Sequence, residues 1–319
     1  MNMLDRFNRD LTYLRVSMTD RCNLRCTYCM PEEGVETLLH EEILSFEELY
    51  TIIEKFVGLG VKKLRITGGE PLVRKDVVEF VRKVSQLKRL DDIAMTTNGV
   101  LLKSFAESLK EAGLHRVNIS LDTLNHDRYK LMSRGGQLRN VLEGIHEALR
   151  VGLKVKLNCV VNSGINDDEI SDFIQLTQDW GVDVRFIELM PIGSNIAYAK
   201  KYFYSNELIL LQHPELKSVI ADDPSSPARY YKLENAKGKV GLISPLSCNF
   251  CAYCNRLRLT SDGKLKPCLH SDIEIDLKTP LRAKQDILPL ILESYQVKPE
   301  KHLLDEHQMI VRHMSQIGG

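Results

Sequence analysis

The sequence predicts an α/β fold built on a parallel sheet. Six apolar runs typical of strands alternate with five amphipathic helical patterns up to about residue 190. This alternation is typical of parallel strands joined by right-handed helical crossovers. Polar residues also gather directly after the strands, at the edge where parallel α/β folds build their sites. These observations leave two architectures open, an open doubly wound sheet and an incomplete barrel.

Each strand is predicted where apolar residues run together, and each helix where they recur at helical spacing. The predicted strands are Tyr13–Met18, Lys63–Thr67, Asp92–Thr97, Arg116–Leu121, Lys154–Val160 and Asp183–Leu189. The predicted helices are Phe46–Val57, Val77–Leu87, Leu102–Ala112, Val141–Val151 and Asp168–Trp180. Because no GxGxxG fingerprint follows the first strand, a dinucleotide-binding fold has little support.

The last third of the chain has weaker patterns. Residues 191–238 are mixed and include the loop-like segment Asp-Asp-Pro-Ser-Ser-Pro at 222–227. Lys239–Ser244 is predicted to be a strand, and the C-terminal residues one or two short helices and a tail. In that tail, His302, His307 and His313 are expected at the surface. We expect one domain over residues 1–230 and a second over 231–319.

Composition excludes several classes of function. The 319 residues are 43% hydrophobic and 27% charged, and Lys plus Arg equals Asp plus Glu at 43 each. This balance provides no overall field for nucleic acid or for an acidic membrane surface. The sequence contains no apolar run of membrane-spanning length and no signal-peptide segment at its start. We expect a cytoplasmic protein that binds neither nucleic acid nor a membrane.

Three cysteines lie in one short loop directly after the first predicted strand. Cys22, Cys26 and Cys29 have the spacing C-x3-C-x2-C. Thiolates suit iron–sulfur clusters or zinc, and three thiolates leave the fourth metal vertex open. A structural zinc site with its fourth ligand elsewhere is the alternative, although zinc ribbons usually contain C-x2-C pairs.

Four further cysteines form a second group. They are Cys248, Cys251, Cys254 and Cys268. A zinc site with four thiolate ligands also fits this spacing. The Arg-Leu-Arg-Leu segment that follows alternates like a strand, so Arg256 and Arg258 share a face beside the metal. That face either binds an anion or is simply solvated. Cys159, alone between the two groups, is expected to be a small buried hydrophobe.

Four predicted strands carry a cation, although strands buried on both faces should be apolar. The cations are Arg15, Arg65, Lys156 and Arg185. Internal ion pairs with Glu70, Asp122 and Glu188 are one explanation, because a buried charge needs a partner. The other is an anionic ligand in a shared lumen, and a polyphosphate fits best.

Taken together, these motifs resemble the radical S-adenosylmethionine (SAM) enzymes and, within them, the GTP 3',8-cyclase family of molybdenum cofactor biosynthesis. The motifs are the three-cysteine loop, Arg65–Pro71, Thr96–Gly99, Phe186–Glu188, the second cysteine group and the terminal Gly318-Gly319. The resemblance covers nearly the whole chain. It implies an incomplete (β/α)6 barrel of the TIM type over residues 1–230, closed by a C-terminal iron–sulfur cluster domain over 231–319.

The resemblance implies two [4Fe–4S] clusters and SAM as cofactors. The first cluster would be held by Cys22, Cys26 and Cys29, and its open iron would chelate SAM. The positions expected to line SAM are Tyr28, Gly69, Glu70, Ser120 and Met190. The second cluster would be held by Cys251, Cys254 and Cys268, and its open iron would face guanine. Whether Cys248 also ligates this cluster, and so closes it, stays open.

The resemblance also implies GTP as the substrate of a radical lyase. A 5'-deoxyadenosyl radical from SAM would take hydrogen from the ribose C3', and the carbon radical would attack C8 of guanine. The product would be (8S)-3',8-cyclo-7,8-dihydroguanosine 5'-triphosphate. The expected substrate contacts are Arg15, Arg65, Thr96, Lys156, Arg256, Leu257 and Arg258. Gly318 and Gly319 are expected to enter the active site and to take part in catalysis.

The expected partners are an external electron donor, the downstream cyclic pyranopterin monophosphate synthase and a second copy of the chain in a homodimer. Two rival functions stay open. A radical enzyme that matures peptides usually carries more C-terminal cysteines than this chain does. An electron carrier or a zinc-stabilised binding module would need neither Gly68-Gly69-Glu70 nor the strand cations.

Overall fold

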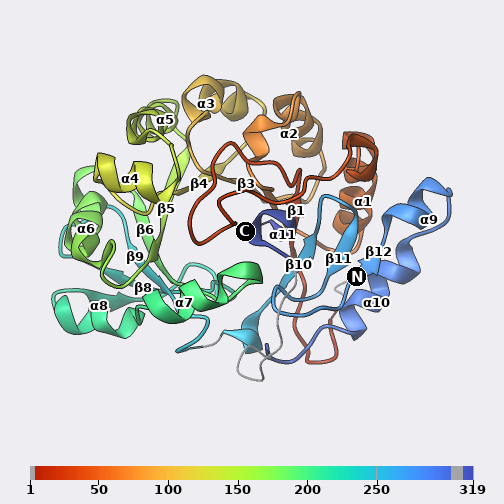
Figure 1. The fold of residues 1–319 in the computed structure, drawn as a ribbon. Helices are drawn as coiled ribbons and strands as arrows, with labels where there is room; N and C mark the ends of the chain where they lie inside the picture. The colour runs from red at the N-terminus through yellow and green to blue at the C-terminus, as the bar shows by residue number, and fades with distance from the viewer. Residues whose placement is uncertain (1–3, 249, 303–311, 319) are drawn as a thin grey trace.

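A single curved sheet organises the chain. The computed structural model describes residues 4–248, 250–302 and 312–318. Its twelve strands lie in the order β12-β11-β10-β1-β2-β3-β4-β5-β6-β9-β8-β7. Strands β1 to β6 are neighbours in chain order and pair in parallel. The sheet curves around a central space that holds helix α11 (Met314–Ile317) (Figure 1). The predicted incomplete barrel is confirmed, and the doubly wound alternative is wrong.

The central strands and most helices lie close to their predicted positions. The strands are β1 (Tyr13–Ser17), β2 (Lys63–Thr67), β3 (Asp92–Thr97), β4 (Arg116–Ser120), β5 (Lys154–Val161) and β6 (Asp183–Glu188). The predicted helices are α1 (Phe46–Gly58), α2 (Val77–Ser85), α3 (Leu102–Glu111), α5 (Leu138–Arg150) and α6 (Ile170–Asp179). Helix α4 (His126–Met132) was not predicted, because its 7 residues are too few for a periodicity test.

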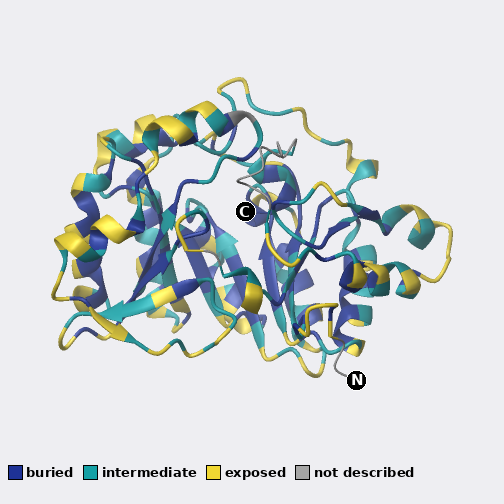
Figure 2. Ribbon diagram, turned by 90° about the horizontal axis from the view of Figure 1, so that it is seen from below, coloured by how far each residue is buried: buried dark blue, intermediate teal, exposed yellow. Residues whose placement is uncertain are grey.

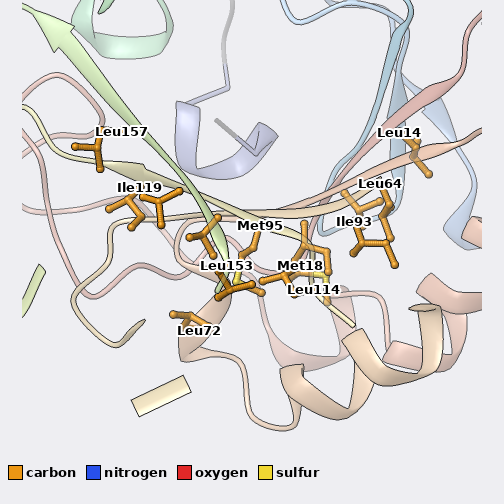
Figure 3. Close-up of a cluster of buried hydrophobic side chains, with 14 of the residues drawn as sticks. Leu14, Met18, Leu64, Leu72, Ile93, Met95, Leu114, Ile119, Leu153 and Leu157 are labelled. Atoms are coloured by element: carbon orange, nitrogen blue, oxygen red, sulfur yellow. The ribbon is translucent and has the colours of Figure 1, made fainter. Parts of the chain in front are cut away.

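The hydrophobic core lies between the sheet and the outer helices. Leu14, Leu64 and Ile93 are paired in register on β1, β2 and β3, and each is at most 1% exposed. They lie together on one side of the sheet (Figure 3). Because side chains alternate along a strand, Arg15 and Arg65 point to the opposite side, into the barrel. Exposed residues lie on the helices and on the loops, whereas the strands are largely buried (Figure 2).

The C-terminal part of the chain extends the sheet at both ends. β9 (Val240–Ile243) pairs in parallel with β6, and β10 (Arg256–Leu259) pairs in parallel with β1. The outer strands are β7 (Lys217–Val219), β8 (Ala228–Lys232), β11 (Lys264–Lys266) and β12 (Ile275–Asp276). The expected domain boundary at residue 230 falls within β8. We therefore propose that each domain carries one of the two cysteine groups and that both domains contribute strands to the same sheet.

Four more helices complete the described part of the chain. They are α7 (Ile196–Tyr202), α8 (Asn206–Gln212), α9 (Lys278–Arg282) and α10 (Leu288–Gln296). None of the helices in the described ranges has the length and apolar character needed to cross a membrane.

Candidate active site

A cavity of about 350 Å³ lies in the centre of the barrel. Its wall includes the carboxyl ends of the central strands and six cysteines from two distant parts of the chain. These cysteines are Cys22, Cys26, Cys29, Cys251, Cys254 and Cys268. The volume is within the range of small-molecule sites. The fold therefore brings both predicted cysteine groups to one site.

The loop that carries the first three cysteines is fixed by its backbone. The N–H of Cys29 donates to the carbonyl of Cys26 at 2.9 Å, which turns the loop back on itself. The N–H of Thr27 donates to the carbonyl of Met132 at 2.9 Å, which ties the loop to the end of α4. These contacts set the positions of the thiols before any metal binds.

The thiols of this loop fit a multi-iron cluster. Burial, followed by the charges of neighbouring cysteines and Asp122, raises the pKa of Cys26 well above its usual value. Burial and Cys22 raise the pKa of Cys29 to about 12. Three such thiolates need a cationic group among them. Within the described ranges, no three His, Cys, Asp or Glu side chains are placed to hold a single metal ion. A cluster, whose thiolates bind different irons, fits better than zinc.

Two glycines pack directly against the start of the cysteine loop. The N–H of Gly69 donates to the carbonyl of Thr19 at 2.7 Å. A Cβ on Gly69 would lie 2.3 Å from the carbonyl oxygen of Arg21, and a Cβ on Gly68 would lie 2.8 Å from that of Thr19. Both glycines also line the cavity. They are thus required for close backbone approach, in addition to any contact with a cofactor.

The Glu70 carboxylate does not lie where the sequence suggested. It is fully buried, and it is absent from the cavity wall. It accepts hydrogen bonds from the Thr97 hydroxyl at 2.8 Å and from the backbone N–H groups of Leu72 and Asn98 at 3.0 and 2.7 Å. Burial raises its pKa to about 7. Glu70 therefore joins the ends of β2 and β3, and its side chain lies outside the cavity wall that the other positions expected to line SAM share.

The other positions expected to line SAM are in the cavity wall. They are Tyr28, Gly69, Ser120 and Met190. The Tyr28 hydroxyl donates to Asp122 at 2.9 Å, and burial raises the pKa of Asp122 to about 6. This bond orients the aromatic ring beside the first cysteine group.

The second cysteine group contains three cavity residues and one outlier. Cys251, Cys254 and Cys268 line the cavity, whereas Cys248 is exposed and is not in its wall. Burial opposes ionisation of Cys254, but the charges of Arg256 and Lys298 lower its pKa to about 6. The site is therefore suited to hold a metal-binding thiolate.

Four arginines form a cationic wall in the cavity that both cysteine groups line. Arg15 pairs in register with Arg65 on β2 and with Arg258 on β10. Arg256 lies two residues before Arg258, on the same face. All four line the cavity. Burial and the neighbouring Arg256 lower the pKa of Arg258 to about 10, and burial and Arg258 lower that of Arg15. An anion in the cavity would relieve this repulsion.

The carboxylates predicted to neutralise the strand cations are used elsewhere. They are Glu70, Asp122 and Glu188. Each accepts hydrogen bonds from backbone N–H groups or hydroxyls. Within the described part of the chain, Nε of Arg65 and Nη2 of Arg256 are buried without a hydrogen-bond partner. Of the four strand cations, Arg65 therefore lacks the predicted carboxylate partner within the described residues, whereas Lys156 is paired with a different carboxylate, that of Asp183.

The side chains of two expected substrate residues do not line the cavity. Lys156 forms an ion pair with Asp183 at 2.6 Å and is absent from the cavity wall. Leu257 is 1% exposed and packs in the hydrophobic core, because it alternates with the two arginines of β10. By contrast, Thr96 and Arg185 line the cavity.

The described end of the chain lies inside the barrel. The carbonyl of Gly318 accepts hydrogen bonds from Arg258 at 2.8 Å and from Arg15 at 3.4 Å. Gly318 has φ +71°, and a Cβ there would lie 2.2 Å from Oγ1 of Thr67. Helix α11, which directly precedes Gly318, is accordingly at the centre of Figure 1. Gly319 lies outside the described residues.

Three cavity residues were missed by sequence reasoning. They are His270, Lys298 and His302. His302 was expected at the surface, but its Nε2 is 2.9 Å from the carbonyl oxygen of Pro245, and its ring is 5.2 Å from that of His270. Of these three, only His270 could have been predicted from the sequence, because it lies two residues after Cys268. His307 lies outside the described residues.

Two family models divide nearly the whole chain between them. Residues 16–177 match the radical SAM superfamily, and residues 182–304 match the family described as Molybdenum Cofactor Synthesis C. The structure also resembles that of SuiB from Streptococcus suis bound to S-adenosylmethionine, with a TM-score of 0.63 and 16% identity. That match covers 88% of this chain and 65% of SuiB, and it concerns the fold alone.

Full-length relatives are much closer in sequence. The chain is 53% identical to the GTP 3',8-cyclase of Peptoclostridium acidaminophilum, over 99% of this chain and 98% of the relative. It is 54% identical to the GTP 3',8-cyclase of Alkaliphilus oremlandii, over 99% of this chain and all of the relative. The chain therefore belongs to the radical SAM superfamily and, within it, to the GTP 3',8-cyclase family.

Proposed function

We propose that this chain is a GTP 3',8-cyclase that converts GTP to (8S)-3',8-cyclo-7,8-dihydroguanosine 5'-triphosphate in the first step of molybdenum cofactor biosynthesis. The observation that supports this function best is the arrangement of the cavity. Two groups of three thiols line it together with a wall of buried and half-buried arginines. A cofactor site and a polyphosphate site thus share one enclosed space.

The first cysteine group provides the cofactor end of the cavity. Cys22, Cys26 and Cys29 would hold one [4Fe–4S] cluster, and Gly69 and Met190 lie in the adjacent wall. When bound, this cluster and SAM supply the 5'-deoxyadenosyl radical that starts the reaction. The protein orients both groups and excludes water from the buried strand ends. Tyr28 and Ser120 complete this part of the wall.

The arginine wall provides the substrate end. We propose that Arg15, Arg65, Arg256 and Arg258 bind the triphosphate of GTP beside Thr96, while the second cluster on Cys251, Cys254 and Cys268 faces guanine. Guanidinium groups suit this task because they donate in pairs to phosphate oxygens. Lys156 is already paired with Asp183, whereas Arg185 lines the cavity. We therefore propose that Arg185 on β6, and not Lys156 on β5, is the cation that contacts the substrate on this side of the cavity.

This proposal is tested by product formation under anaerobic conditions. The reconstituted chain is incubated with SAM, a low-potential reductant and GTP, and the nucleotides are analysed by mass spectrometry. The expected result is the 3',8-cyclised triphosphate, with no corresponding product from ATP. Efficient SAM cleavage that modifies an added peptide and leaves GTP unchanged would instead support a peptide-maturing enzyme.

Replacing Arg256 and Arg258 together by alanine should weaken GTP binding by about 100-fold or more, because two charged contacts are lost. The reason is that each charged contact to phosphate contributes about 1.5–3 kcal/mol, and about 1.4 kcal/mol is a factor of ten. Calorimetry with GTP measures this loss. Arg139→Ala, which removes an arginine 80% exposed on α5, is the control and should bind GTP normally. Unchanged affinity in the double variant would contradict the assignment of this pair.

Replacing Cys248 by serine should leave iron content and turnover near those of the unmodified chain. The exposed Cys248 is outside the cavity wall, and an open iron is needed for the substrate. Iron analysis and the product assay check this expectation. Cys254→Ser is the matched control and should lose about four irons, as expected for one [4Fe–4S] cluster. A similar loss in the Cys248 variant would indicate a cluster with four thiolates.

The proposed function also implies partners. We propose that an external electron donor reduces the first cluster and that a cyclic pyranopterin monophosphate synthase takes up the product. We also propose that the chain works in the cytoplasm as a homodimer. Size-exclusion chromatography with light scattering checks the last point.

A further inference from the structure

A buried lysine that the reaction does not use lies beside the second cysteine group. Lys298 follows α10 and is 3% exposed. Its ammonium nitrogen lies 3.7 Å from Sγ of Cys254, 2.8 Å from the carbonyl oxygen of Arg256 and 2.7 Å from that of Pro267. A lysine ammonium has three N–H donors, so these three acceptors satisfy it completely.

The three acceptors belong to the two segments that carry metal-binding thiols. Arg256 is the first residue of β10, Cys254 lies two residues before it, and Pro267 immediately precedes Cys268. One ammonium group therefore links Cys254 to the segment of Cys268, although 13 residues of chain separate the two cysteines. Because the linking group is buried and saturated, it fixes the relative positions of two ligands.

Within the described residues, the charge of Lys298 is not paired with a carboxylate. None of the ion pairs found within residues 4–248, 250–302 and 312–318 includes Lys298. A buried ammonium without a counter-charge is costly, so the fold is expected to supply one. The negative group in contact with it is the thiolate of Cys254. The neighbouring cations Arg9 and Arg256 repel it and increase this need.

We propose that Lys298 is a positioning residue that sets the reduction potential of the second cluster and holds its ligands. The inference rests on the proposed function, since it takes Cys251, Cys254 and Cys268 as ligands of a [4Fe–4S] cluster. A hydrogen bond and a positive charge at a ligand sulfur stabilise the reduced cluster, which carries one more negative charge. Lys298 should therefore make this cluster easier to reduce than it would be with a neutral residue in its place.

The test uses the full chain with Cys22, Cys26 and Cys29 replaced by alanine, so that only the second cluster is seen. In this background, Lys298→Gln retains N–H donors and loses the charge. Its EPR-monitored midpoint potential should shift to more negative values, while the iron content stays the same. Lys298→Met, which loses donors and charge, should release iron to a chelator about tenfold faster, the scale typical of lost outer-shell contacts.

Lys266→Met is the matched control. Lys266 is 1% exposed and also binds a carbonyl, that of Ser271, but its charge is paired with Glu274 and it does not contact a thiol. This variant should lose thermal stability and keep the midpoint potential. An unchanged potential in folded, iron-loaded Lys298→Gln would overturn the proposal. If Lys298→Gln cannot be loaded with iron, the charged variant Lys298→Arg is tested instead. Failure of Lys298→Arg to restore iron loading would also overturn the proposal. Absence of iron from the triple-alanine background itself would contradict the proposed function instead.

Discussion

Replacing Cys22, Cys26 and Cys29 together by alanine is expected to abolish reductive cleavage of SAM and to leave about four irons bound per chain. The three thiols lie in one loop whose backbone is fixed by its own hydrogen bonds, and all three line the cavity. Without them no cluster can bind beside Gly69, and electron transfer to SAM has no route. Anaerobic iron and sulfide analysis, together with detection of 5'-deoxyadenosine by chromatography, measures both effects.

Cys159→Ala is the matched control for this triple variant. Cys159 is 1% exposed and contacts the carbonyl of Asp122, but it does not line the cavity. This control should keep about eight irons, as expected for two [4Fe–4S] clusters, and normal SAM cleavage. Normal cleavage in the triple variant would end the assignment of the cofactor site.

Replacing Gly318 by alanine is expected to lower formation of the cyclised product by about 100-fold or more, a loss typical of displacing a reactant by about 1 Å. The added Cβ would lie 2.2 Å from Oγ1 of Thr67. Either α11 must move, or the Thr67 hydroxyl must give up its hydrogen bond to the carbonyl of Val16. The hydrogen bonds from Arg15 and Arg258 to the Gly318 carbonyl would be displaced at the same time. SAM cleavage without GTP and the iron content should stay near normal, because neither cysteine group is changed.

Gly152→Ala is the control that separates the effect of backbone strain from the effect of the steric clash at Gly318. Gly152 has φ +74°, close to that of Gly318, but a Cβ there would meet no atom within 4 Å. Its alanine variant should lose some stability and keep the rate of cyclisation. Deletion of Gly318 and Gly319 should give the same loss of product as Gly318→Ala. Cyclisation at the normal rate in the deletion variant would show that the tail is a tolerant chain end.

Much of the barrel could be predicted from the sequence because its strands are buried on both faces. Lys63–Thr67 and Asp92–Thr97 begin and end as predicted, since apolar runs and their polar boundaries are strong signals. Helix α4 was missed because its position depends on a local cap, in which the Asn125 side chain accepts hydrogen bonds from two backbone N–H groups. Such a short helix leaves little periodicity to read.

The candidate site was harder to predict than the fold. Alternation along a strand placed Arg256 and Arg258 on one face, as the structure has them. The resemblance listed Leu257 with them as a substrate contact, although its side chain packs in the core. Alternation did not show that Lys156 lies outside the cavity, because depth inside a barrel depends on the stagger between strands. Lys298 and His302 lie in irregular segments after α10, and only tertiary structure brings them to the second cysteine group.

The central claim is that GTP is held in the cavity so that its ribose reaches the radical derived from SAM. The most direct measurement uses GTP deuterated at C3', incubated anaerobically with the reconstituted chain, SAM and reductant. The predicted result is deuterium in 5'-deoxyadenosine together with the 3',8-cyclised triphosphate. Formation of unlabelled 5'-deoxyadenosine alongside unchanged, fully deuterated GTP would contradict the account.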